Sequence, residues 1–154
     1  MATLPESACV LIESGPLAHL VTLNADGSPQ VTCVWMGLDG GELVAGHLMR
    51  HQKIRNIERD PRVVASFEGT RIHPPGVKEY LVVHGRARVT KGGAPELLQR
   101  LAHVYLGPGV KFPPMPDPPP GFVTHITVER IGGVGAWTPA DSVEGRLFAE
   151  VLGL

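Results

Sequence analysis

The sequence predicts a mainly β protein, a small antiparallel β-barrel with short helices between its hairpins. Two turn signals, at residues 24–27 and 39–41, separate short runs of strand-forming residues, and their glycines supply the positive φ that hairpin turns need. Residues 79–90 alternate apolar and polar side chains along their length, the period of a half-buried strand. No βαβ repetition is present, which argues against a doubly wound parallel sheet.

Length, charge and composition narrow the possible function classes. A chain of 154 residues suggests one domain, 1–154, that can bury a substantial core. A net charge of −1 argues against nucleic acid or a membrane surface as a bulk partner, and no apolar run approaches the roughly 20 residues of a membrane span. The N-terminus lacks a secretory signal, and two cysteines, Cys9 and Cys33, make no disulfide framework, so a cytoplasmic location is expected.

The first third of the chain predicts a helix and then three short strands. Residues 4–14 favour a helix, because Pro5 suits a first turn and Ala8, Leu11 and Ile12 share one face. The two turns then delimit strands at 19–23, 30–36 and 42–46.

A basic segment follows the third strand. Residues 51–60 are expected to form a helix that ends before Pro61, with Ile54 and Ile57 toward the core. The segment opens with a cluster of side chains that can bind anions: Arg50, His51, Gln52, Lys53 and Arg55. Beside the free N–H groups of a helix start, such a cluster suits a phosphate. An ordinary solvated amphipathic helix explains the same spacing.

The clearest strand is 79–90, which follows a strand at 62–68 and a loop at 69–76. One of its faces is apolar and carries Leu81, Val83, Ala87 and Val89. A strand of this length usually bends around a barrel, and Gly85 is where it could kink.

The last third of the chain combines one helix, a proline-rich segment and one more strand. Residues 94–106 predict an amphipathic helix with Pro95 in its first turn. Residues 107–121 include seven prolines, so this segment cannot pair inside a sheet. It is either a surface excursion or a flap that borders a ligand site. A strand at 122–131 follows, and 138–154 predicts a C-terminal tail helix.

The common catalytic motifs are absent from the sequence, which has no GxSxG, no HExxH and no Walker loop. His47 and His51 are four residues apart, but no carboxylate or cysteine lies nearby in the sequence to complete a metal site, so no metal is expected. No residue pair suits the roles of general acid and base, and no catalytic side chain is assigned. A site of backbone amides, hydroxyls and a basic cluster suits a redox cofactor that carries the chemistry itself.

Four segments, in this order, resemble the flavin- and deazaflavin-binding split-barrel superfamily, the pyridoxamine 5′-phosphate oxidase-like group that includes coenzyme F420-dependent reductases. The segments are 18–46, 53–69, 80–90 and 126–137. The resemblance implies an FMN-binding split barrel with antiparallel, Greek-key-like strands. It also implies a homodimer with the cofactor at the subunit interface and a small-molecule substrate.

The resemblance further implies which residues surround the cofactor ring. Thr32, Cys33 and Val34 would line the isoalloxazine-type ring, largely through backbone groups. Gly46 and His47 would approach the ring edge and the ribityl chain.

The cofactor phosphate would be bound by Gln52, Lys53 and Arg55, and the resemblance makes Lys53 the main contact. Trp137 would come from the other subunit and border the ring.

Two departures separate the sequence from the oxidase pattern. The oxidase has arginine at the positions of Thr32 and Gln52, and the absence of these arginines favours F420 over FMN. The C-terminal substrate-binding segment of the oxidase has no counterpart here, which argues against vitamin B6 oxidation. The resemblance therefore implies an oxidoreductase that uses reduced coenzyme F420 to transfer hydride to a small conjugated organic acceptor. The alternatives are an FMN-dependent oxidoreductase and a non-catalytic flavin-, deazaflavin- or haem-binding protein.

Overall fold

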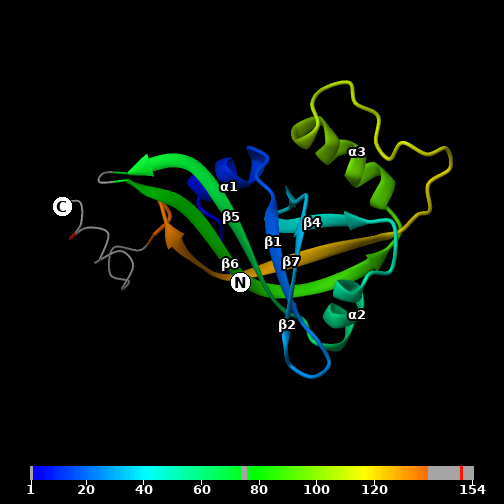
Figure 1. Ribbon diagram of the computed structural model, residues 1–154, viewed down its shortest axis with the longest axis horizontal. Coiled ribbons are helices and arrows are strands. Elements are labelled where there is room, and N and C mark those ends of the chain that lie inside the picture. Colours follow the sequence, from blue (N-terminus) through cyan, green and yellow to red (C-terminus); the bar gives the residue numbers. More distant parts are fainter. Residues whose placement is uncertain (1, 74–75, 139–149, 151–154) are drawn as a thin grey trace.

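Seven strands and three short helices make up the part of the chain that the computed structural model describes, residues 2–73, 76–138 and 150 (Figure 1). The strands are β1 (Ala18–Leu23), β2 (Pro29–Val34), β3 (Gly37–Asp39), β4 (Glu42–His47), β5 (Arg62–His73), β6 (Val77–Lys91) and β7 (Phe122–Val134). The helices are α1 (Glu6–Glu13), α2 (Gln52–Arg59) and α3 (Ala94–Tyr105). None of the helices in the described ranges is both long and apolar enough to cross a bilayer.

The strands form one antiparallel sheet in the order β2-β1-β5-β6-β7-β4-β3. β2 and β3 stand at opposite ends of this order, yet only Trp35 and Met36 separate them in the sequence. The sheet therefore has to curl until its two edges meet at these residues. The predicted mainly β, antiparallel barrel with short helices is confirmed. The described β2 and β3 share no ladder, so both remain edges of the sheet and the chain itself joins them.

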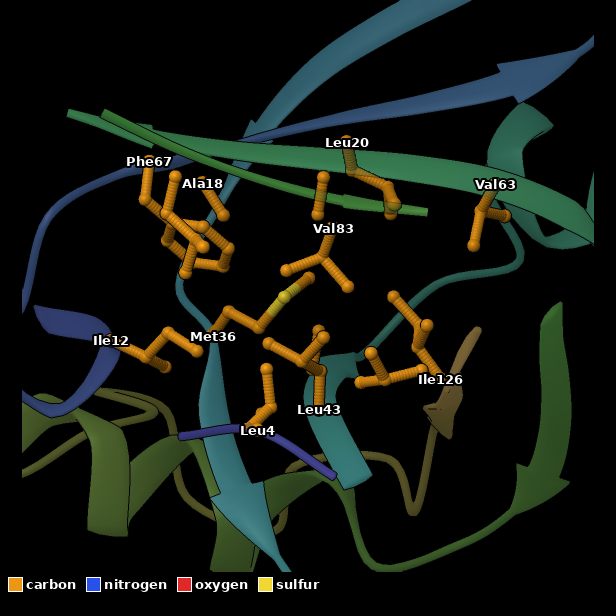
Figure 2. Packing of buried hydrophobic residues seen from close by; sticks show 14 of the residues in the cluster. Leu4, Ile12, Ala18, Leu20, Met36, Leu43, Val63, Phe67, Val83 and Ile126 are labelled. Carbon is orange, nitrogen blue, oxygen red and sulfur yellow. The ribbon is translucent and has the colours of Figure 1, made fainter. Parts of the chain in front are cut away.

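Apolar side chains from most of the strands converge inside the curl (Figure 2). Phe67 of β5, Leu20 of β1, Val83 of β6 and Ile126 of β7 are all nearly inaccessible to solvent, and Met36 joins them from the crossing between the two edges. β6 shows the predicted alternation, with its odd-numbered residues buried from 79 to 87. This core fixes which face of each strand is free to meet a ligand or a partner.

The long strand β6 bends at Gly85, as its sequence predicts. The register with β7 shifts between His84 and Gly85. A Cβ at Gly85 would lie 2.3 Å from the carbonyl oxygen of Thr127, so no side chain fits there. The bend carries the β5–β6 hairpin away from the rest of the sheet (Figure 1).

Strand lengths are where the structure departs from the sequence-based expectation. β5 continues to His73, so the predicted loop at 69–76 is strand over its first part. Gly69 permits this continuation, because a Cβ at that position would lie 2.2 Å from Cγ of Glu79. β7 also runs three residues beyond the predicted end at 131, and the three-residue strand β3 was not predicted.

The proline-rich segment 107–121 is tied to α3. The side-chain amide of Gln99 donates to the carbonyl oxygen of Val110 at 2.9 Å and accepts from the backbone N–H of Phe112 at 2.9 Å. Phe112 lies against Trp35, with ring centroids 5.0 Å apart, and Trp35 stacks on Tyr105 at 5.3 Å. Trp35 therefore packs against both α3 and the proline-rich segment, and the segment returns to the sheet at a fixed place.

Most of the predicted tail helix, 138–154, lies outside the described residues. Thr138 is described, and its hydroxyl donates to the carbonyl oxygen of Gly133 and accepts from the N–H of Gly135. Thr138 therefore closes the turn that follows β7.

Candidate functional site

α2 begins directly after His51 and presents an unusual buried face. Ile54 and Ile57 are covered by the sheet, as expected for an amphipathic helix, but Lys53 and Asn56 lie on the same buried face. This helix is therefore more than a solvated cover for the core.

Lys53 is the most distinctive side chain of this helix, with only 8% of it exposed. Burial lowers the pKa of its ammonium group. Among the described residues it has no hydrogen-bond acceptor and no carboxylate counter-ion. Removing a cation from water without a partner is unfavourable, and a bound anion reverses that cost.

His47 lies beside Lys53 at the end of β4. It is 4% exposed, and its Nε2 lies 2.9 Å from the hydroxyl of Thr124 on β7. Burial, followed by the nearby Lys53 and then His51, lowers the pKa of His47 to about 3. His47 is therefore neutral at physiological pH and acts as a hydrogen-bonding group. Burial and Lys53 lower the pKa of His51 as well.

Gly46 precedes His47 and is held against α3. A Cβ at this position would lie 3.1 Å from Cγ of Leu98 and 3.3 Å from the carbonyl oxygen of Ala94. Helix packing thus gives a reason for glycine here that is independent of any ligand.

The predicted ring-lining residues lie on the edge strand β2 and do not share a face. Thr32 and Val34 are on the inner side, and Cys33 is exposed on the outer side. The hydroxyl of Thr32 is buried and has no hydrogen-bond partner among the described residues. Because β2 is an edge, one row of its backbone N–H and C=O groups has no strand partner. These groups and the Thr32 hydroxyl are available to a ligand.

The other predicted phosphate-binding residues are placed differently from Lys53. The amide of Gln52 donates to Oδ1 of Asn56 at 2.8 Å, and Arg55 is exposed. Lys53 and Arg55 are two positions apart, so they lie on different faces of α2. Arg50 forms an ion pair with Glu58 at 2.7 Å. The structure thus brings together Lys53, His47 and His51, and leaves Arg55 outside this group.

Trp137 is in the core of its own chain and 6% exposed. It follows β7, whose C-terminal end lies well away from α2 (Figure 1). Its indole Nε1 is buried without a hydrogen-bond partner among the described residues. It also lines a cavity of about 470 Å³ between α1 and the β5–β6 hairpin. No residue of α2 lines this cavity, and the contact of Trp137 with the cofactor across a dimer interface stays a prediction.

A buried polar network beneath α2 was not predicted from the sequence. Asn56 is fully buried, and its side-chain amide bonds to Thr22 and Asn24 of the β1–β2 hairpin. The available signal was an asparagine in the apolar stripe of an amphipathic helix, between Ile54 and Ile57. Thr124, the partner of His47, carried no comparable signal, because a threonine is ordinary in a strand.

The sequence matches a known protein family over most of its length. The family model of pyridoxamine 5′-phosphate oxidase matches residues 4–135. The chain belongs to this family. This family, together with an F420 reductase of the same fold described below, places the chain in a flavin- and deazaflavin-binding fold of oxidoreductase type. No curated protein matches the sequence.

Solved structures with this fold include proteins of different names. An F420 reductase is 28% identical with a TM-score of 0.67, covering 84% of this chain and 98% of its own. A conserved hypothetical protein from Mycobacterium tuberculosis is 22% identical with a TM-score of 0.65, covering 93% of each chain. A heme binding protein from Mycobacterium smegmatis is 24% identical with a TM-score of 0.61, covering 97% of this chain and 62% of its own. The last two support the fold alone.

Proposed function

We propose that this protein is an oxidoreductase that binds reduced coenzyme F420 and transfers hydride to a small conjugated organic acceptor. The observation that carries the proposal is Lys53, whose side chain is mostly buried and whose ammonium group has no counter-ion among the described residues. The phosphate of F420 supplies the missing negative charge. The F420 reductase with 28% identity over 84% of the chain supports this cofactor over others.

The residues around Lys53 fit a phosphorylated tricyclic cofactor. Lys53 would hold the phosphate, with His51 beside it at the start of α2. The unpartnered Thr32 hydroxyl and the free edge of β2 offer donors and acceptors to the ring. His47 stays neutral and bonded to Thr124, so it adds no charge to the ring edge.

The chemistry belongs to the cofactor and the protein supplies position. When bound, reduced F420 supplies a hydride to an electron-poor carbon, and solvent supplies the proton that completes the reduction. The protein's own residues anchor the phosphate, orient the ring along β2 and exclude water. Orientation of this kind is a large part of catalysis where no acid–base pair is needed.

The proposal includes a homodimer with the cofactor at its interface. Val31, Val21 and Val64 form one cross-strand row over β2, β1 and β5, and Val31 is 61% exposed. Val21 and Val64 are half-buried, and a row of apolar side chains that remains accessible on a sheet is typical of a surface that a partner covers. The resemblance implies that a second copy contributes its Trp137 to the cofactor site.

Binding of the cofactor tests the proposal directly. Titration with F420, FMN and haem, followed by fluorescence or absorbance, should show F420 bound most tightly. Lys53→Met keeps the apolar stem and removes the charge, and loss of a charge-assisted contact of about 1.5–3 kcal/mol should weaken F420 binding by about 10- to 100-fold. Lys78→Met is the matched control, because Lys78 is 56% exposed and pairs with Glu68 on the far hairpin.

Three outcomes separate the alternatives. Preferential binding of FMN would replace F420 by a flavin, and preferential binding of haem would refute the oxidoreductase assignment. F420 binding without reduction of any compound in a panel of enones and quinones would make the protein a carrier. Equal F420 affinity in Lys53→Met and the wild type would remove the observation on which the proposal rests.

A further inference from the structure

Asn56 is completely buried, and every hydrogen-bonding position of its side chain is used. Its Nδ2 donates to the hydroxyl of Thr22 at 3.0 Å and to Oδ1 of Asn24 at 2.9 Å. Its Oδ1 accepts from Gln52 at 2.8 Å and from Arg59 at 3.1 Å. A fully satisfied buried amide fixes the relative position of the elements that it joins.

The two elements that Asn56 joins carry the two parts of the proposed cofactor site. Lys53 lies three residues before Asn56 on the same buried face of α2. On the hairpin, Gln30 accepts from Thr22 and approaches Asn56 Nδ2 at 3.4 Å. Thr32 is two residues beyond Gln30 and therefore on the same side of β2.

We infer that Asn56 is a positioning residue for the anion site. It sets the place of the Lys53 ammonium group relative to the edge of β2, and it does so without touching the ligand, because none of Asn56 is exposed. The inference rests on the proposed function and deepens it. It identifies the part of the ligand that depends on Asn56, which is the phosphate and not the ring.

The same network also constrains Gln52. Its amide already donates to Asn56, so Gln52 serves first to complete the network and is drawn toward the helix rather than outward. Arg59 closes the other side, donating both to Asn56 and to the carbonyl oxygen of Leu23 at 2.6 Å. Helix α2 is thereby held to the hairpin through Asn56 at its middle and through Arg59 at its C-terminal end.

The test compares ligands with and without the phosphate. The ratio of affinities for FMN and riboflavin, and for F420 and its phosphate-free riboside, measures the phosphate contact alone. We expect the wild type to favour the phosphorylated member, and Asn56→Leu to reduce that preference by about tenfold, because small displacements of a binding group have effects of this size. Thr22→Val, which removes one partner of Asn56 on the hairpin side, should reduce it in the same direction by less. Neither change adds a charge.

Two further variants make the result decisive. Val83→Ala, in the core of β6, should lower the melting temperature and leave the affinity ratio unchanged. Lys53→Met should abolish the preference altogether. An unchanged ratio in both network variants, or an equal loss in Val83→Ala, would overturn the role of Asn56 while the Lys53 site stands. A wild type without any preference for phosphorylated ligands would overturn both. If Asn56→Leu does not fold, Thr22→Val decides.

Discussion

Acidification should destabilise this protein through His47. Its pKa falls from 6.5 in an unfolded chain to about 3 in the folded protein, first because it is buried and then because Lys53 and His51 lie near. The unfolded state therefore binds a proton in a pH range where the folded state does not. The stabilising contribution is complete above pH 6.5 and decreases as the pH falls from 6.5 toward 3.

The size of the effect follows from the two pKa values. At pH 5 the unfolded histidine is protonated and the folded one is still neutral, so lowering the pH from 7.5 to 5 should cost about 2 kcal/mol of the free energy of unfolding through this residue. Urea unfolding of the wild type and of His47→Gln at both pH values measures it. Glutamine can still bond to Thr124 and does not titrate. The wild type should lose about 2 kcal/mol more than the variant.

His103→Gln is the control for this experiment, because His103 is an exposed histidine on α3. It should lose as much stability on acidification as the wild type does. Subtracting the stability loss of His47→Gln from that of the wild type also removes the contributions of other titrating groups. These include His51 and His84, whose pKa values are lowered as well. Equal losses in the wild type and His47→Gln would show that this explanation of the His47 environment is wrong.

Two other changes test the fold and the assembly. Gly85→Ala would place a Cβ 2.3 Å from the backbone oxygen of Thr127 and should destabilise by more than about 3 kcal/mol, whereas Gly132→Ala has no atom within 4 Å and should have little effect on the melting temperature. Val31→Asp puts a charge at the exposed end of the valine row on the proposed dimer surface. Light scattering should show that this variant is a monomer, and its affinity for F420 should be lower than that of the wild type. A variant that stays dimeric would show that the interface lies on another surface of the molecule.

Much of the fold could be predicted because the strong local signals agree with one another. The hairpin turns at Gly27 and Gly41 both have positive φ, as their sequences require. The alternation of β6 and the bend at Gly85 could also be predicted, because the sequence signals for both lie within one strand. What could not be predicted depends on distant neighbours. β5 passes through Gly69 as a strand because Glu79 of β6 occupies the space beside it.

The candidate site was predictable in part, for the same reason. The basic cluster before α2 pointed to residues 50–55, but sequence alone could not tell which of them would be buried. Arg50 pairs with Glu58 and Arg55 stays exposed, and only Lys53 turns toward the sheet. The role of Asn56 depends on partners more than 25 residues away along the chain, such as Asn24. No local pattern encodes such a contact.

The polar side chains around α2 differ in how their burial is compensated, and the difference points to function. The amide of Asn56 is satisfied by hydrogen bonds, and His47 avoids the cost of a buried charge by staying neutral. Lys53 is a cation with a mostly buried side chain, and its ammonium group has no counter-ion among the described residues. Stability by itself would favour methionine or leucine at this position, since an apolar side chain of similar size packs without a desolvation cost. A lysine here is best explained by an anion that the chain does not supply, and a phosphorylated cofactor supplies one.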